Sequence, residues 1–94
     1  MRLVGLPILE AFIKEHADTG NWISCWISEV KASNWDTPTE LKQRYPLASI
    51  LPGNRVYFNV KGNKYRLETL IAYKVKLVTV IWIGTHAEYN KRNK

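Results

Sequence analysis

Apolar residues in the first half of the chain recur every three to four positions, which is the spacing of one helix face. One such stripe predicts a helix from Pro7 to about Gly20, and Pro7 suits the first turn because the amide hydrogen that proline lacks has no partner there. A second stripe predicts a helix that starts near Asn21. The two stripes consist of Ile8, Leu9, Phe12 and Ile13, and of Trp22, Ile23, Trp26, Ile27 and Val30.

The second stripe contains two tryptophans four residues apart. Such a pair can bind a ligand, but large aromatic side chains at helical spacing more often form the buried face, and we interpret them as core. After a polar break, Asp36 or Thr37 can cap a short helix from Pro38 to Arg44. Tyr45 ends this helix, because a residue before proline avoids the helical conformation.

The second half of the chain changes to a period of two, which predicts strands. Residues 56–60, 65–73 and 77–83 form three such segments, joined by turns at 61–64 and 74–76. The third segment is almost continuously apolar, which is typical of a central strand that is covered on both faces.

The order of these elements predicts an α+β fold and a single domain, residues 1–94. The two N-terminal helices are expected to pack on one face of an antiparallel sheet whose C-terminal part is a three-strand meander. The other face of the sheet stays open. Residues 1–5 fit either an edge strand or an extended segment, and residues 87–94 fit either a short helical turn or a loose tail.

Positive charge is concentrated in the second half. Residues 1–53 carry five Lys/Arg and six Asp/Glu, net −1, while residues 54–94 carry nine and two, net +7, and the two sum to +6. This asymmetry favours an anionic partner, with nucleic acid as the first candidate. A solvated lysine surface without any partner is the alternative.

The composition also narrows the chemistry of a site. The single cysteine, Cys25, cannot form an intramolecular disulfide, and no Cys/His set has the spacing of metal ligands, so we expect no metal and no cofactor. A lone cysteine fits a reducing cytoplasm. The longest strongly apolar run, residues 77–84, is far shorter than the roughly 20 residues of a spanning helix, and charges interrupt any signal peptide. We therefore expect no membrane association.

Charged side chains follow one face of the second predicted strand. Lys64, Arg66 and Glu68 lie two residues apart, so they share the face that the helices leave open. A row of cations on an open sheet suits a chain of phosphates, which arginine binds through two parallel hydrogen bonds. The alternative is an ordinary surface ion pair between Arg66 and Glu68, which contributes little stability.

A histidine follows the third predicted strand. His86 can exchange protons near neutral pH, although a lone histidine is more often structural than catalytic. Tyr89 lies on the same face if the segment is helical, where it can stack on a base or hold the tail in place. Thr85 either orients His86 or ends the strand. The other histidine, His16, is interpreted as a solvent-facing or helix-end residue.

Residues 56–67 (VYFNVKGNKYRL), followed by residues 84–89 (GTHAEY), resemble the HigB toxin family. This family consists of mRNA-cleaving toxins of type II toxin–antitoxin modules, within the RelE superfamily. The helix with paired tryptophans and residues 33–38 (SNWDTP) resemble the first half of that family, so the resemblance covers nearly the whole chain. It implies a small RelE-like sandwich, which agrees with the order of elements above.

The resemblance implies a cytoplasmic endoribonuclease (an mRNA interferase) that cleaves mRNA, in most relatives on the translating ribosome, through attack by the RNA's own 2′-hydroxyl and without a metal. It also implies a HigA-like helix-turn-helix antitoxin, with DNA contacted only through the complex. Arg66 and Lys64 would stabilise charge on the phosphate, His86 would be general acid or base, Glu68 its partner, and Tyr89 would position the substrate. The residues expected to bind RNA or the ribosome are Arg55, Lys61, Asn63, Lys74, Lys76, Lys91 and Arg92.

The chain departs from the family pattern in the strand before the Thr-His pair. Residues 79–83 (TVIWI) carry no charge where the pattern has a basic residue. A phosphate-stabilising group is then either missing, which leaves open a weakened toxin, or replaced by Lys64 or Lys76. Asn90, where relatives have an acid, is a milder departure. Two other functions remain open: a toxin that blocks a target such as gyrase or the ribosome without cutting RNA, and a non-catalytic RNA-binding module.

Overall fold

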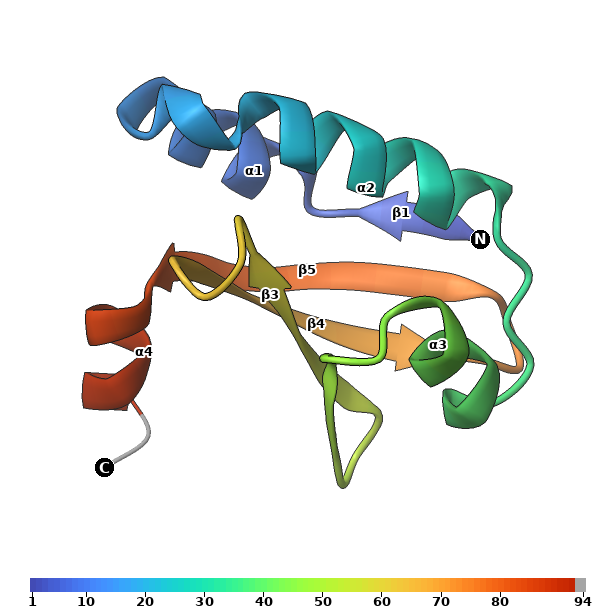
Figure 1. The fold of residues 1–94 in the computed structure, drawn as a ribbon. Helices are drawn as coiled ribbons and strands as arrows, with labels where there is room; N and C mark the ends of the chain where they lie inside the picture. The colour runs from blue at the N-terminus through green and yellow to red at the C-terminus, as the bar shows by residue number, and fades with distance from the viewer. Residues whose placement is uncertain (93–94) are drawn as a thin grey trace.

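The computed structural model describes residues 1–92 and contains a five-stranded sheet with helices on both sides. Figure 1 shows α1 and α2 together on one side of the sheet and α4 at the end of the strands on the other side. The elements in chain order are β1 (Arg2–Val4), α1 (Leu6–Glu15), a 3₁₀ turn (Ala17–Thr19), α2 (Gly20–Ala32), α3 (Pro38–Arg44), β2 (Ser49–Leu51), β3 (Arg55–Val60), β4 (Tyr65–Ala72), β5 (Leu77–Thr85) and α4 (His86–Arg92).

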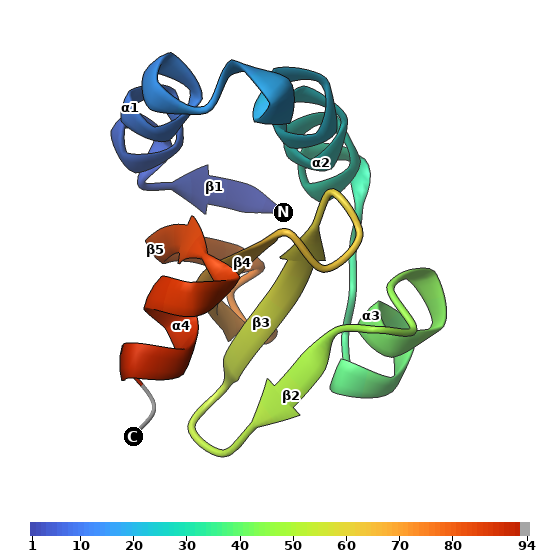
Figure 2. The same cartoon turned by 60° about the vertical axis from the view of Figure 1, so that its left-hand side comes forward.

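The strand order is β1-β5-β4-β3-β2, and the predicted meander of β3, β4 and β5 is confirmed. The prediction of a purely antiparallel sheet is wrong, because β1 runs parallel to β5. The crossover from β1 through the helices and the meander to β5 returns the chain in the same direction. Strand β2 was not predicted, since a segment of three residues is too short to show an alternation. Figure 2 displays β2 at the edge of the sheet, beyond β3.

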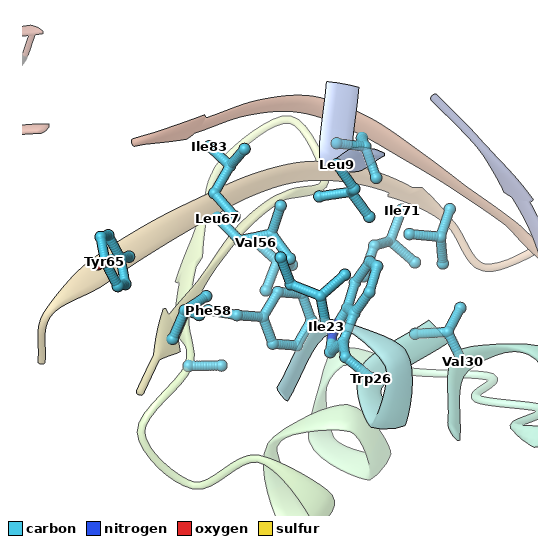
Figure 3. Close-up of a cluster of buried hydrophobic side chains, with 14 of the residues drawn as sticks. Leu9, Ile23, Trp26, Val30, Val56, Phe58, Tyr65, Leu67, Ile71 and Ile83 are labelled. Atoms are coloured by element: carbon cyan, nitrogen blue, oxygen red, sulfur yellow. The ribbon is translucent and has the colours of Figure 1, made fainter. Parts of the chain in front are cut away.

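The hydrophobic core lies between the sheet and the two N-terminal helices. The helical stripes contribute Leu9 and Phe12 from α1 and Trp26 from α2, all of them buried. The strands contribute their alternate side chains, and in Figure 3 Leu67 lies among the helical residues of this layer. The interpretation of the tryptophan pair as core is confirmed for Trp26, while Trp22 is half-buried at the rim.

The ends of the helices follow local sequence signals. α3 spans the predicted residues, and the Thr37 hydroxyl accepts a hydrogen bond from the amide of Glu40 at 3.3 Å, as expected of a cap. Gly20 was expected to stop the first helix, but α1 ends at Glu15 and Gly20 begins α2. Gly5 has φ +96°, and a Cβ there would lie 2.7 Å from the Val80 carbonyl oxygen, so α1 can cross close to β5 only with glycine at this position.

A bulge interrupts β5 and changes which side its residues face. Glu68 pairs with Trp82 and Thr69 pairs with Val80, which leaves Ile81 without a partner on β4. Val78 and Val80 face the helices before the bulge, and Ile83 does so after it. The prediction that this strand is covered on both faces is wrong, because Ile81 is exposed and the outward positions are only partly covered.

Residues 86–92 adopt the helical alternative that was predicted for the C-terminal segment, and residues 93–94 of that prediction lie outside the described residues. Within residues 1–92, no helix has the length and apolar character needed to cross a membrane. Among the same residues, no group of three or more histidine, cysteine, aspartate or glutamate side chains is placed to hold a metal ion.

Candidate functional site

The candidate site lies on the sheet face away from α1 and α2, near the end where β5 leads into α4. One row of the sheet is formed by Ser49, Tyr57, Glu68 and Trp82, which are in register across β2, β3, β4 and β5. Arg66 lies in the next row towards α4, opposite Asn59. Because side chains alternate along a strand, all of these project to the same face.

Arg66 is at the centre of the site and is only 7% exposed. Its Nη1 donates a hydrogen bond to Asn59 Oδ1, and its Nη2 donates to Ser49 Oγ at 3.3 Å and to Tyr89 Oη at 3.5 Å. The guanidinium also lies 4.5 Å from the ring of Tyr89 and 5.5 Å from that of Tyr57. Its Nε is buried without a hydrogen-bond partner. A buried arginine with a spare donor is suited to an anionic ligand.

Glu68 is 1% exposed and is held by two arginines from different elements. Arg92 of α4 donates to its Oε1 at 2.6 Å, and Arg55 of β3 lies 3.4 Å from its Oε2. Burial and the nearby Glu68 carboxylate raise the pKa of Tyr57. The alternative of a surface ion pair between Arg66 and Glu68 is therefore wrong, since Glu68 is buried and both of its ion pairs are with other arginines.

The start of α4 is fixed by a reciprocal pair of hydrogen bonds. The amide of Glu88 donates to Thr85 Oγ1 at 3.1 Å, and the amide of Thr85 donates to Glu88 Oε1 at 2.8 Å, which together form a capping box. These bonds from Thr85 lower the pKa of Glu88. Thr85 therefore has the second of its two predicted roles, since it ends the strand and caps the helix.

The capped helix places two predicted residues on one side. The rings of His86 and Tyr89 are 5.7 Å apart, and Tyr89 packs edge-on against Tyr57 at 5.1 Å. His86 begins α4 directly after β5, and Tyr89 contacts both His86 and Arg66. Asn90, the departure noted above, lies with its Nδ2 3.4 Å from His86 Nδ1.

α4 places a cation, Arg92, beside the uncharged end of β5. The guanidinium of Arg92 lies 4.3 Å from the Trp82 ring, so an arginine from the helix stands beside the strand that carries no charge of its own. Gly84 makes room for that ring, because a Cβ there would lie 2.7 Å from Trp82 Cη2. Arg92 was predicted only as an RNA-binding residue, and the geometry brings it next to the centre of the site.

Lys64 lies outside this site. Its ammonium group is 3.1 Å from Asp18 Oδ2, and the same carboxylate accepts a hydrogen bond from Tyr65 Oη at 3.1 Å. Lys64 lowers the pKa of Asp18. Because Asp18 belongs to the helix layer, the prediction that Lys64 continues the row of Arg66 is wrong, and its catalytic role stays a prediction. His16 follows the last residue of α1, so the helix-end interpretation is confirmed, and its half-buried ring stacks on that of Phe12 at 4.3 Å.

The other predicted RNA-binding residues are spread over both ends of the sheet. Lys76 binds Asp36 and the Trp35 carbonyl, at the end of β4 opposite to His86. The eight residues of β4 span about 25 Å, so Lys76 and its exposed neighbour Lys74 are far from Arg66. Neither Lys64 nor Lys76 thus replaces the missing strand cation. The exposed predicted residues at the near end are Lys61, Asn63 and Lys91.

Sequence reasoning missed four members of the site. Ser49, Asn59, Tyr57 and Trp82 contact Arg66 or its neighbours, yet each was read only as part of a strand or a linker. Asn59 could have been found by pairing the predicted hairpin, since residues 59 and 66 are equidistant from its turn. The pattern T-x-x-E at 85–88 was a visible sign of the capping box.

Comparison with known families places this site in context. Residues 20–92 match the family model of the HigB toxin, the RelE-like toxic component of a toxin–antitoxin system. A comparison with curated protein sequences finds no match. The match covers α2 and everything after it, including Arg66, Glu68 and α4. The chain belongs to the HigB toxin family and is the RelE-like toxin of a toxin–antitoxin system, which implies an antitoxin partner.

Proposed function

We propose that this toxin is an endoribonuclease that cleaves mRNA at the Arg66 site. The observation that carries the proposal is the state of Arg66: buried, fixed by Asn59 and Ser49, and left with an unpartnered Nε. Two further arginines, Arg55 and Arg92, form ion pairs with the neighbouring Glu68. A preorganised cationic group of this kind stabilises the charge that develops on a phosphate in the transition state.

The proposed reaction uses the 2′-hydroxyl of the RNA as nucleophile. A base removes its proton, the 2′-oxygen forms a bond to phosphorus, and the bond from phosphorus to the 5′-oxygen of the next nucleotide breaks. That oxygen takes up a proton from an acid, and the products are a 2′,3′-cyclic phosphate and a free 5′-hydroxyl. The protein must therefore bind the phosphate, transfer two protons and align the three reacting atoms.

His86 is assigned the proton transfer and Tyr89 the alignment. The His86 ring is half-buried at the start of α4, where it is both held in place and open on one side. Tyr89 bridges His86 and Arg66, so a phosphate bound to the guanidinium lies next to the tyrosine hydroxyl. Glu68 positions Arg55 and Arg92 rather than acting as base, because both of its oxygens already accept ion pairs.

The target is proposed to be mRNA on the translating ribosome, in the cytoplasm, and the antitoxin to be a HigA-like helix-turn-helix protein. The chain carries a net charge of +6, and the exposed cations Lys61 and Lys91 lie at the same end of the sheet as the site, which supports a nucleic-acid target. DNA would be contacted only through the antitoxin complex.

The test is cleavage of a defined mRNA by purified toxin, with and without ribosomes. We expect a 2′,3′-cyclic phosphate product, and a loss of about 100-fold or more in rate for Arg66→Ala and for His86→Ala. Lys14→Ala, an exposed cation of α1 on the other side of the sheet, is the matched control and should keep its rate. Wild-type rates in both site variants would refute the assignment.

A toxin that blocks its target without cutting RNA is the second candidate. It is favoured by Trp82, which occupies an outward position of β5 where a cation would be expected to contact the phosphate. This function predicts that translation stops while mRNA stays intact. Growth arrest with DNA damage signalling and intact mRNA would instead indicate gyrase as the target.

A further inference from the structure

A cavity of about 250 Å³ lies next to the Arg66 site, at the edge of β3 that β2 does not cover. It is a half-open pocket bordered by α2, by the segment that follows α3 and by the turn between β3 and β4. Its Trp22 and Phe58 walls belong to the helix side of the sheet, and it meets the Arg66 side at Asn59, at the edge of β3. Its lining is mostly apolar and aromatic, and consists of Trp22, Arg44, Tyr45, Pro46, Leu47, Ala48, Phe58, Asn59 and Gly62.

One residue that lines this cavity contacts the arginine, and a second lining residue precedes another of its contacts. Asn59 lines the cavity and also accepts the hydrogen bond from Arg66 Nη1. Ala48 lines the cavity and is followed by Ser49, whose hydroxyl accepts from Arg66 Nη2. A ligand that places an anionic group on Arg66 can therefore reach this apolar pocket past Asn59.

The walls of the cavity suit a flat ring. The indole of Trp22 is half-buried, and the ring of Tyr45 is held by the Glu29 carboxylate, which accepts its hydroxyl at 2.6 Å. The guanidinium of Arg44 lies 4.9 Å from the centre of the Tyr45 ring and is itself paired with Glu29. The volume is below the roughly 300–1,000 Å³ of pockets for drug-sized ligands, so the space accepts one ring system rather than a whole nucleotide.

A polar group at the boundary adds a means of recognition. Arginine has only hydrogen-bond donors, so the Asn59 atom that faces Arg66 must be its oxygen, and the amide NH₂ remains as a donor. This donor can bind a ring nitrogen or a carbonyl oxygen of a base.

We propose that this cavity is a nucleobase subsite, which binds the base adjacent to the phosphate that Arg66 holds. The proposal rests on the proposed function, because it needs a phosphate at Arg66. Base stacking on the aromatic wall fixes the RNA strand relative to His86, so the cavity takes part in choosing where the strand is cut. Stacking tolerates any base, and the Asn59 donor favours bases that present an acceptor.

The test uses ligands that cannot be cleaved, so that it does not depend on ribonuclease activity. The full chain is titrated with adenosine 3′- and 5′-monophosphate, ribose 5-phosphate and inorganic phosphate, and binding is followed by NMR. We expect the better of the two nucleotides to bind about tenfold tighter than ribose 5-phosphate, with shifts at the Trp22 indole and the Gly62 amide. Ribose 5-phosphate and inorganic phosphate should shift Arg66 and its contacts Ser49 and Tyr89, but not Trp22 or Gly62.

Variants separate the cavity from the phosphate site. Leu47 is 74% exposed at the rim, and Val75 is 67% exposed in the turn at the far end of β4. Leu47→Ser should lower the ratio of nucleotide affinity to ribose 5-phosphate affinity several-fold. Its matched control Val75→Ser should leave this ratio unchanged. Trp22→Leu should remove the advantage altogether and keep the affinity for ribose 5-phosphate, which also shows that this variant is folded.

Three results would overturn the proposal. Equal affinity for nucleotide and ribose 5-phosphate, with both still bound at Arg66, refutes the subsite but leaves the proposed function standing. If none of the phosphate ligands binds, both the phosphate site and the subsite are refuted. Shifts at Trp22 and Gly62 that appear only with the antitoxin assign the cavity to a protein partner instead.

Discussion

The two faces of β4 are both buried near its start, but they are held by different forces. On the helix side, Tyr65, Leu67 and Ile71 pack into the core with other apolar side chains. On the opposite side, Arg66 and Glu68 are almost as buried, yet their neighbours are arginines, tyrosines and an asparagine. One face depends on the area removed from water, and the other depends on the geometry of individual bonds.

The difference shows which face a ligand can rearrange. The helix side is close-packed and offers no polar group to a charged ligand, so its arrangement stays the same when a phosphate binds. The bonds of Arg66 and Arg92 are to groups that a phosphate can replace or supplement. The helix α4, which closes over the polar face, has no buried residue of its own. A substrate can therefore alter the polar face and leave the core as it is.

The largest expected effect comes from breaking the apolar face. Leu67→Ala removes a side chain that is 0% exposed and leaves a cavity in the core, so we expect a loss of about 3 kcal/mol in the free energy of unfolding. Leu70→Ala, on the same strand but exposed on the other face, is the control and should cost under about 1 kcal/mol. Denaturant unfolding measures both, and equal losses would show that the core is not the dominant face.

Gly84→Ala should overpack the polar face. The added methyl meets the Trp82 ring, which must then move away from its place under Arg92, and we expect a loss of about 1–3 kcal/mol in unfolding free energy. The control is Gly20→Ala at the start of α2, where an added Cβ would have ordinary space and the helix should gain about 0.5–1 kcal/mol. If the free energy of unfolding changed in the same direction in both variants, the crowding of Trp82 would not be the cause of the effect at Gly84.

Glu68→Gln should loosen the polar face without emptying it. The neutral amide keeps the shape but loses both ion pairs, and because Arg55 and Arg92 are partly exposed we expect only about 1–2 kcal/mol. The measurement is denaturant unfolding together with NMR shifts of α4, which should change more than those of α1. Glu10→Gln, an exposed change in α1, is the matched control.

The smallest effect concerns the capping box and pH. The pKa of Glu88 is lower in the folded chain than in the unfolded chain, so its contribution to stability is present above the usual glutamate pKa of about 4.3 and is lost as the pH falls below it. NMR shifts of α4 should report fraying in acid. Glu88→Gln should flatten this dependence, and an unchanged profile in that variant would rule out the capping carboxylate as its origin.

Sequence patterns predicted the elements that depend on local signals. The helical stripes, the Thr37 cap and the hairpin turns act over a few residues, so their position could be read directly. Strands β1 and β2 were harder, because three residues carry little pattern and their partners lie far away in the chain. The parallel pairing of β1 with β5 is likewise set by tertiary packing.

The candidate site was predicted in part, for a similar reason. Arg66, Glu68 and Tyr89 were found from alternation and helical spacing. The structure brings Arg66 and Tyr89 into contact and places Glu68 in the next row of the same sheet face. Lys64 was misplaced because it precedes the strand, where the turn lets its side chain reach Asp18 on the helix side. The nearness of Arg92 to Trp82 arises from the docking of α4, which no local pattern records.

The bulge at Ile81 makes one residue of β5 dispensable to both faces of the sheet. Val80 and Trp82 are two residues apart yet face opposite sides, because Ile81 lies outside the alternation of the ladder. Ile81 itself is exposed and has no partner on β4, so many residue types can take its place. Deleting it would leave Trp82 opposite Glu68 and Ile83 opposite Leu67, so the strand would regain a regular ladder and both faces would keep their residues. In relatives with this fold, we expect position 81 to tolerate both substitution and loss.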